Sequence, residues 1–554
     1  MKKRLLVVAG TCLLAVSLSA CGFFHLPDFF GSSNGNGYSY RPINSSDDSP
    51  YPSASTPSEY DTIYPISDLE PISMAKTYED FAEHNAYPIS VTPAQGNVKL
   101  LVIPVWFSDS TSFIATSSRD KVRSDIQTAY FGSASDAGWH SVKSYYETES
   151  HGALTLTGTV SEWYEPGSSY KTYRADSEAT LNLVKSATNW YFSNHSDIRR
   201  NYDADSNGYL DGVMLIYAAP DYDALGNESY DNLWAYCYWT QDYENQNVSN
   251  PVPNAYFWAS YDFMYGRNDV LSRTGKTTNY YSGDTRYCNL DTHTYIHEMG
   301  HMFGLDDYYD YSGQYHPAGA FSMQDHNIGG HDPYSSLALG WGKAYIPTET
   351  MTLKLKPFAE TGEMILLSPS WNSYGSPFDE YLILEYYTAT GLNELDSHHA
   401  YQDGYPTGST VSGIRLWHVD ARLLYANIYT DSDFSATKIT TNPDMGSQNG
   451  VTHMMSNTYW KNEEGIDDYV SPLGQSYANY NLLQLIRNNT TATYKPTDFF
   501  NKNALFGQGS YFSMADYSRQ FVKTGKLNSN KDLGFSFTVE RLTSEDATIT
   551  INKL

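Results

Sequence analysis

Positive charge is scarce in this sequence. Its 554 residues include 35 lysines and arginines against 63 aspartates and glutamates, so the formal net charge is −28 at pH 7. An acidic surface of this kind repels phosphate groups, which argues against nucleic acid or an anionic lipid surface as an electrostatic partner. It suits a soluble surface that faces the outside of a cell.

Cysteine is rare as well, with four residues in the whole chain. Cys12 and Cys21 lie in the N-terminal segment, so the body of the protein retains only Cys237 and Cys288. In an oxidising compartment these two could form one disulfide, and two buried free thiols are the alternative.

Long apolar runs are missing after the first twenty residues, and nothing further along is long and apolar enough to span a bilayer. Residues 1–20 themselves predict an export signal. Lys2, Lys3 and Arg4 give a positive start, and the apolar stretch over residues 5–17 is too short for a comfortable transmembrane helix. The sequence also lacks internal repeats and a clear propeptide.

The end of this signal carries a second feature. Leu18-Ser19-Ala20-Cys21 resembles a bacterial lipoprotein box. The resemblance implies that Cys21 becomes the lipidated N-terminus of the mature protein, on the extracellular side of the bacterial cell membrane. Ordinary secretion with cleavage after Ala20 is the alternative. Residues 21–75 are rich in Ser, Pro, Gly, Asn and Asp and cannot bury a core, so they predict a flexible tether.

One short segment carries the chemistry. His297-Glu298-Met299-Gly300-His301 contains two histidines four residues apart. On a helix this spacing places both imidazoles on one face, one turn apart, where they can bind one zinc ion. Glu298 follows the first histidine, so its carboxylate can act as the general base on a water whose pKa zinc has lowered.

A catalytic zinc site also needs a third protein ligand and an open position. Gly304 can adopt a positive φ and end the helix, after which the chain can turn back and present Asp307. A helix buried on one side is indicated by an apolar stripe at helical spacing, formed by Ile296, Met299, Gly300 and Phe303. A buried helix with two structural histidines is the alternative interpretation.

The segment from His297 to Tyr309 reads H-E-x-G-H-x-x-G-L-x-D-x-Y, and F-S-M-x-D follows at Phe321 to Asp325. This combination resembles the immune inhibitor A-like secreted metallopeptidases of bacteria. The resemblance implies a metzincin-type fold, one catalytic zinc and endopeptidase activity, with Met323 in a turn beneath the metal. Some members place the third acid one position later, where this chain has Tyr308, so we expect Asp307 as the ligand, with Asp306 as the alternative.

A second metal site is predicted upstream. Oxygen-bearing residues recur at alternate positions with glycine at the sixth, which suits calcium, and they are Asp203, Asp205, Asn207, Tyr209 and Asp211. The match to an EF-hand loop is incomplete, because Met214 stands where a bidentate glutamate belongs and residues 213–218 predict a strand. The family resemblance favours calcium, and an Asx-rich turn is the alternative.

The predicted fold class is α+β, with a metzincin-like zinc peptidase domain over residues 76–345 and a β-rich, sandwich-like region over residues 346–554. Alternating or apolar strands are predicted at residues 99–107, 153–160, 351–355, 381–386, 413–420, 535–539 and 547–551, and helices at residues 141–150 and 178–192. Among nearby histidines, His316, His326 and His331 could contact substrate or stabilise an oxyanion, although surface positions are commoner, and His418 is expected to be structural.

The leading hypothesis is a lipid-anchored, zinc-dependent endopeptidase that acts as a monomer on extracellular proteins or peptides. Glu298 would serve as its general base. One alternative is a surface adhesin whose residues 346–554 bind a cell-wall or host ligand. Another is a zinc hydrolase that acts on a bond other than a peptide bond.

Overall fold

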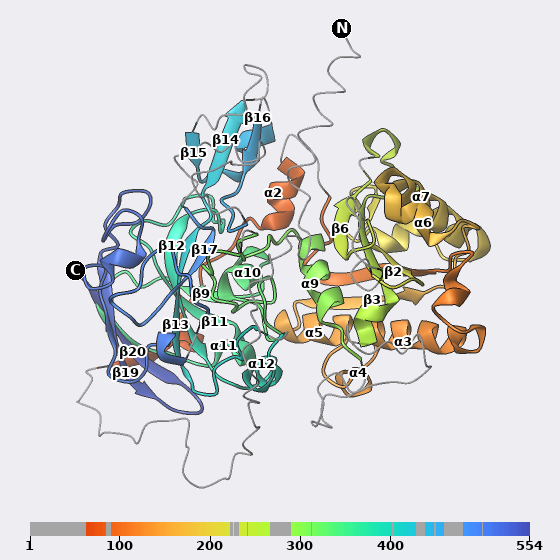
Figure 1. Ribbon diagram of the computed structural model, residues 1–554. Coiled ribbons are helices and arrows are strands. Elements are labelled where there is room, and N and C mark those ends of the chain that lie inside the picture. The colour runs from red at the N-terminus through yellow and green to blue at the C-terminus, as the bar shows by residue number, and fades with distance from the viewer. Residues whose placement is uncertain are drawn as a thin grey trace.

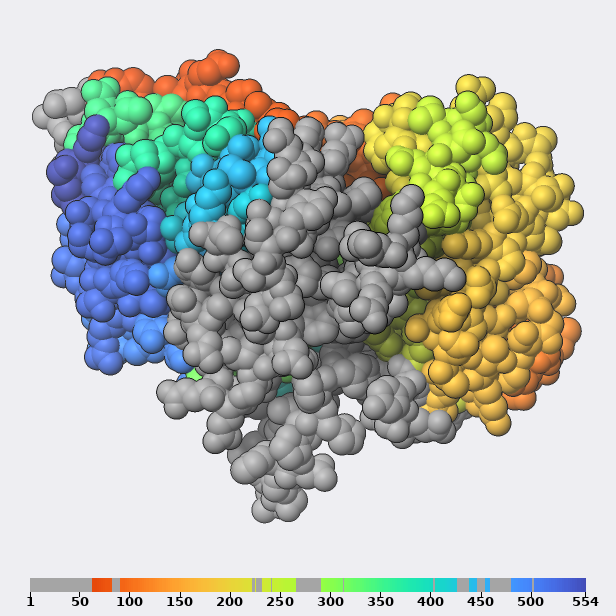
Figure 2. Space-filling model, turned by 90° about the horizontal axis from the view of Figure 1, so that it is seen from above, coloured from red at the N-terminus to blue at the C-terminus, as the bar shows by residue number. Residues whose placement is uncertain are grey.

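The computed structural model describes residues 62–84, 90–221, 225, 232–240, 242–265, 290–311, 313–401, 404–427, 438–447, 450–458, 480–500 and 502–554. They form a mixed α/β protein with several β-sheets and few helices. Figure 1 shows two halves, with β2, β3 and α7 on the right and the strands from β9 onward on the left. Seen from above, the two halves lie on opposite sides of the molecule (Figure 2).

The N-terminal half is built around a five-stranded sheet of order β3-β2-β5-β8-β6. Its strands are β2 (Gly96–Val105), β3 (Leu154–Val160), β5 (Val213–Tyr217), β6 (Tyr236–Trp239) and β8 (Ala255–Ser260). All are parallel except β6, which runs antiparallel to β8. Parallel strands are joined by helical crossovers that cover both faces, which explains why β2 is one long apolar run.

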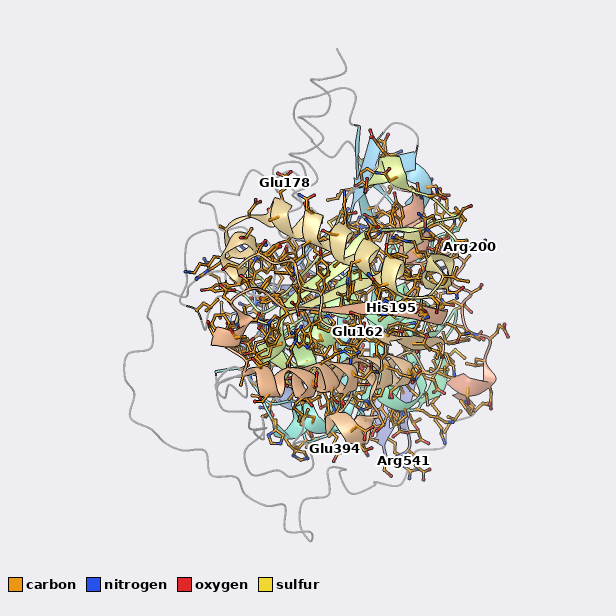
Figure 3. All side chains as sticks on the ribbon, turned by 90° about the vertical axis from the view of Figure 1, so that its right-hand side faces the viewer. Glu162, Glu178, His195, Arg200, Glu394 and Arg541 are labelled. Carbon is orange, nitrogen blue, oxygen red and sulfur yellow. The ribbon has the colours of Figure 1, made fainter. Side chains whose placement is uncertain are left out.

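Alternate residues of β2 point to two different cores. Leu100 and Val102 join the core formed with α3 (Arg119–Phe131) and α5 (Val142–Glu149). Leu101 and Ile103 join the core formed with α7 (Ser177–Asn194). Figure 3 shows α7 along its face of the sheet, with Glu178 in its first turn.

The predicted zinc helix is α9 (His293–Met302), and it packs against β8 and β6. Its apolar stripe is buried as expected, with Ile296 and Met299 in the same core as α3 and α5. Gly304 has a φ of 98°, so the helix ends where the glycine predicts.

Two further five-stranded sheets form the C-terminal half. The first has the order β17-β13-β12-β11-β9, with β9 (Lys343–Tyr345), β11 (Glu363–Leu367), β12 (Glu380–Tyr387), β13 (Gly413–Asp420) and β17 (Leu483–Ile486). The second has the order β1-β10-β20-β19-β18, with β1 (Ile63–Pro65), β10 (Met351–Leu355), β18 (Tyr511–Phe512), β19 (Phe535–Leu542) and β20 (Ala547–Lys553). These bounds confirm the five strands predicted after residue 346.

The central strand β12 shows how the two halves meet. Leu382 and Leu384 face Phe537 and Ile549 of the second sheet, which makes the two sheets a sandwich. Ile383 between them, together with Tyr381, joins the core that also contains α9. One apolar core therefore extends across the predicted domain boundary at residue 345.

Part of the predicted tether is ordered. Strand β1 pairs in parallel with β10, and Ile66 is buried. Residues 62–75 therefore belong to the fold, because they add an edge strand to the second C-terminal sheet. Of the described helices, none combines the length and apolar character needed to cross a membrane.

The remaining elements are short. The other helices are α2 (Tyr78–His84), α4 (Ala134–Ala137), α6 (Tyr170–Ala175), α10 (Pro333–Ala338), α11 (Phe358–Thr361) and α12 (Asn393–His398). The other strands are β4 (Tyr209–Leu210), β7 (Val252–Pro253), β14 (Leu423–Asn427), β15 (Lys438–Thr440) and β16 (Gly450–His453).

Candidate metal centre and active site

Asp307 completes a triad with the two histidines of α9. Its Oδ1 lies 3.2 Å from Nε2 of His297 and 3.3 Å from Nε2 of His301, and the two Nε2 atoms lie 3.1 Å apart. In tetrahedral coordination with bonds of about 2.0 Å, the edges between ligand atoms measure about 3.3 Å. The triangle of these three atoms therefore fits three corners of a zinc tetrahedron.

The second ring nitrogen of each histidine is held by a backbone carbonyl. His297 Nδ1 lies 2.7 Å from the oxygen of Met323, and His301 Nδ1 lies 2.8 Å from the oxygen of Leu305. Because a carbonyl only accepts, each Nδ1 carries the proton and donates it. A neutral imidazole then presents a lone pair at Nε2, as a metal ligand must. Two lone pairs that face each other at 3.1 Å require a cation, so this donor set fits zinc.

The charges around the triad favour a cation at its centre. Burial lowers the pKa of His301, but the facing Asp307 outweighs it and raises that pKa to about 9. Burial would raise the pKa of Asp307, yet His301 and His297 hold it well below its usual range. The triad thus keeps an ionised carboxylate and favours positive charge at its centre.

Asp307, not its neighbour Asp306, faces the histidines. The Tyr311 hydroxyl donates to Oδ2 of Asp307 at 2.7 Å and leaves Oδ1 directed at the two Nε2 atoms. Asp306 is half-buried, and desolvation raises its pKa to about 6 although Ser456 donates a hydrogen bond to it. Of these two acids, only Asp307 belongs to the cluster that could hold a metal ion.

The segment around Met323 lies directly against the helix. Met323 is fully buried and supplies the carbonyl that orients His297. The next side chain, Gln324, explains the glycine between the histidines. A Cβ added to Gly300 would lie 2.2 Å from Oε1 of Gln324, so only glycine permits this approach. The Gln324 side chain also reaches His301, with Nε2 3.3 Å from Nδ1.

Glu298 is fully buried beside the first ligand. Its negative charge reaches β6, because it adds to burial in raising the pKa of Cys237 on that strand. It also contributes to the raised pKa of His301. The charge of Glu298 therefore acts on both His301 and the edge strand of the sheet.

The nearby histidines do not join the triad. His331 is buried, which lowers its pKa to about 3, and its Nε2 lies 3.4 Å from the Tyr146 hydroxyl. His326 is half-buried with Nδ1 2.8 Å from Asp325. His418 lies 3.0 Å from Glu380 in the buried C-terminal sheet, so its structural role is as expected.

The loop of residues 203–211 brings three predicted calcium ligands together. Carboxylate oxygens of Asp203, Asp205 and Asp211 lie within 4.8 Å of one another. Burial, reinforced by the neighbouring carboxylates, raises the pKa of Asp205 to about 7 and that of Asp211 to about 8. A cation bound between these carboxylates would remove the repulsion between them.

The other two predicted calcium ligands are engaged within the loop. Asn207 donates from Nδ2 to Asp205 at 2.6 Å and accepts the backbone N–H of Tyr209 at 2.8 Å. Strand β5 follows at Val213, which agrees with the predicted strand in place of a second EF-hand helix.

Several predicted features lie outside the described residues. They are the export signal of residues 1–20, the lipidation site Cys21 and the second cysteine of the body, Cys288. Cys237 is buried on β6. Its pairing with Cys288 stays a prediction.

Three residues that lie near the triad were not predicted from the sequence. Tyr311 is one of 50 tyrosines, and Gln324 has no counterpart in a metal-ligand pattern, so neither residue type stands out. His293 had a usable signal, because it precedes His297 by four residues on the same helix. Its ring centre lies 6.1 Å from that of His297 and 4.5 Å from that of Tyr401.

A scan against models of protein families and a search of curated proteins both found no match to this chain. The class of site is therefore argued from its geometry. The buried triad of two histidines and an aspartate, with a glutamate beside its first member, could hold a metal ion.

Proposed function

We propose that this protein is a zinc-dependent endopeptidase on the outer face of a bacterial membrane. The observation that carries the proposal is the buried triad of His297, His301 and Asp307, with Glu298 beside its first ligand. Three protein ligands leave a fourth position, as in catalytic zinc sites. Zinc bound there would supply a Lewis acid that polarises a carbonyl and lowers the pKa of a water.

Glu298 supplies the proton chemistry. Its carboxylate accepts a proton from the attacking water and later passes it to the amine that leaves. The Nδ1 bonds to Met323 and Leu305 orient both imidazoles so that each Nε2 faces the metal position. Tyr311 fixes the carboxylate of Asp307 in the same way.

The position of strand β6 at the edge of its sheet favours a peptide substrate over an ester or a non-peptide amide. Within the described part of the chain, β6 ends its sheet and pairs only with β8. The helix with the metal ligands packs against it, and the charge of Glu298 reaches its Cys237. An extended peptide could add to this edge through its backbone, which would carry its amide bond past the site. A substrate without a peptide backbone could not pair in this way.

The resemblance to immune inhibitor A-like peptidases supports the same proposal and extends it. It would give the zinc region a metzincin-like fold and make Met323 the methionine of the turn below the metal. Lipid on Cys21 would hold the enzyme at the cell surface, where extracellular proteins and peptides are its substrates. Calcium at Asp203, Asp205 and Asp211 would stabilise the fold.

The test is mass spectrometry of a peptide library incubated with the zinc-loaded full chain. We expect cleavage by the unmodified chain. Glu298→Gln should bind one zinc and lose activity by about 10²- to 10⁴-fold, the usual contribution of a general base. His301→Ala should lose both zinc and activity. Glu162→Gln is the matched control, because this glutamate is exposed and labelled at the surface in Figure 3.

Two results would overturn the proposal. Full turnover by Glu298→Gln would exclude the mechanism. Failure of the zinc-loaded chain to cleave any member of the library would exclude a general endopeptidase.

A further inference from the structure

A row of aromatic rings runs from the metal triad onto the C-terminal half. We call it the aromatic row, and its members are Tyr309, Tyr311, His326, Tyr401, Tyr405 and Phe499. Three of the six come from beyond residue 345. The C-terminal half therefore contributes to the surroundings of the metal centre.

The row meets the metal centre at two places. Tyr311 donates its hydroxyl proton to Asp307 at 2.7 Å. Tyr401 lies 4.5 Å from the ring of His293, which precedes the ligand His297 by one helical turn. A group bound on the row would thus lie next to the reacting atoms.

The rings form one continuous surface. Ring centres are 4.4 Å apart between Tyr309 and His326, and again 4.4 Å apart between His326 and Tyr405, which are stacked at 8°. Tyr405 continues to Phe499 at 5.3 Å and to Tyr401 at 5.8 Å. These spacings are those of interacting aromatic pairs.

The row is not a buried core. Tyr309 is buried, but the other five rings are half-buried. Half-exposed aromatic rings gathered beside a metal triad are typical of a ligand-binding surface. Five of the six rings belong to tyrosine or phenylalanine and carry no charge, and the sixth, His326, lies 2.8 Å from Asp325. The surface therefore suits a neutral planar ring.

We propose that the aromatic row is the subsite that receives an aromatic side chain of the substrate, close to the scissile bond. This inference rests on the proposed endopeptidase function and names its substrate preference. A ring bound on the row gains free energy because its apolar area leaves water, and stacking on the aromatic residues adds to this gain. Tyr401 and Tyr405 act as specificity residues and take no part in proton transfer.

The first experiment measures binding without turnover. Peptides that differ only by phenylalanine or alanine, at one position at a time, are titrated calorimetrically into the zinc-loaded Glu298→Gln chain. We expect one position at which phenylalanine binds about tenfold more tightly than alanine. Tyr405→Ala, made in the same background, should reduce this preference to about twofold, and so should Tyr401→Ala. Tyr405→Phe keeps the ring and should retain it.

The second experiment repeats the comparison with the active chain. Tyr405→Ala should lower kcat/KM for the phenylalanine peptide about tenfold, mainly through KM, and leave the alanine peptide within about twofold. Tyr374→Ala is the control, since this tyrosine is 41% exposed and lies outside the row. Melting curves establish that each variant is folded.

The outcomes separate the two proposals. No preference for an aromatic residue at any position, or an unchanged preference in both folded alanine variants, would overturn the subsite. Absence of hydrolysis by the active chain would instead overturn the endopeptidase proposal, and the binding titrations would still decide the role of the row.

Discussion

At the scale of single residues, the metal centre depends on which of two adjacent acids faces the histidines. Asp307 lies against both Nε2 atoms, whereas Asp306 accepts a hydrogen bond from Ser456. We expect Asp307→Asn to weaken zinc binding by more than about a hundredfold, because the variant loses a charged ligand. Asp306→Asn should change it by less than about threefold, since Asp306 lies outside the ligand set. Competition with a chromophoric chelator measures both, and equal losses would contradict this assignment.

The grouping of His297, His301 and Asp307 was predictable because local geometry brings them together. A helix places residues four apart on one face, so the spacing in the sequence is enough to pair His297 with His301. Gly304 signalled the end of that helix, and its φ of 98° agrees. The residues that contact these three were not predictable, because Tyr311 and Gln324 reach the triad through tertiary packing. The reason for Gly300 likewise lies in the fold, which places Gln324 against it.

At the scale of elements, the loop that leads into β4 and β5 offers a test of calcium. Three carboxylates face one another there, two of them buried and that of Asp205 half-buried, and a divalent cation would remove their repulsion. Adding calcium to a chelator-treated sample should raise the melting temperature by several degrees, since ligand binding to the folded state stabilises it. Asp211→Asn should remove most of this gain. Magnesium is the control, because it prefers a smaller octahedral site. Melting unchanged by calcium would argue for a plain Asx-rich turn.

The contact between α5 and α10 should make stability depend on pH. Glu149 ends α5, lies near Ser336 of α10 and is buried, which raises its pKa from 4.5 to about 8. The folded state therefore holds a proton that the unfolded state releases between these two values. Stability should fall as pH rises through this window, by at most about 1.4 kcal/mol per pH unit for this one group.

Glu149→Gln isolates this contribution. The variant cannot ionise, so it should be more stable than the unmodified chain at pH 8 and should gain nothing at pH 4.5. Denaturant unfolding at both pH values, with the exposed Glu545→Gln as control, measures the difference. A gain that is equal at both pH values would show that ionisation of Glu149 is not its cause.

The elements divide in the same way into predictable and unpredictable parts. β10, β12, β13, β19 and β20 were visible as apolar or alternating runs, since burial on one or both faces leaves that trace. β1 was not, because Ile63–Pro65 is a three-residue edge strand inside a polar segment. The order in which the strands pair could not be predicted from local sequence, because the strands that flank β10 come from opposite ends of the described chain.

At the scale of the whole molecule, the metal centre rests on both halves. Phe321 lies two residues before Met323, whose carbonyl orients His297. Its ring packs 5.9 Å from Tyr387 and 3.9 Å from Phe500, and the Arg415 guanidinium lies 4.0 Å above it. The C-terminal half therefore supports the segment that orients His297, and it also contributes three members of the aromatic row.

This arrangement predicts what happens when residues 346–554 are removed. Exposing one large apolar side chain to water costs about 1.5–3 kcal/mol of stability. Several such side chains lie at this junction. Their sum is comparable to the whole stability of a typical domain, about 5–15 kcal/mol. We expect residues 76–345 alone to show no cooperative unfolding and to bind zinc far more weakly than residues 62–554. Calorimetry and size-exclusion chromatography of the two fragments measure this. A cooperative transition in the shorter fragment near the temperature of the longer one would mean that the halves are independent domains, and that the aromatic row joins two separately folded units.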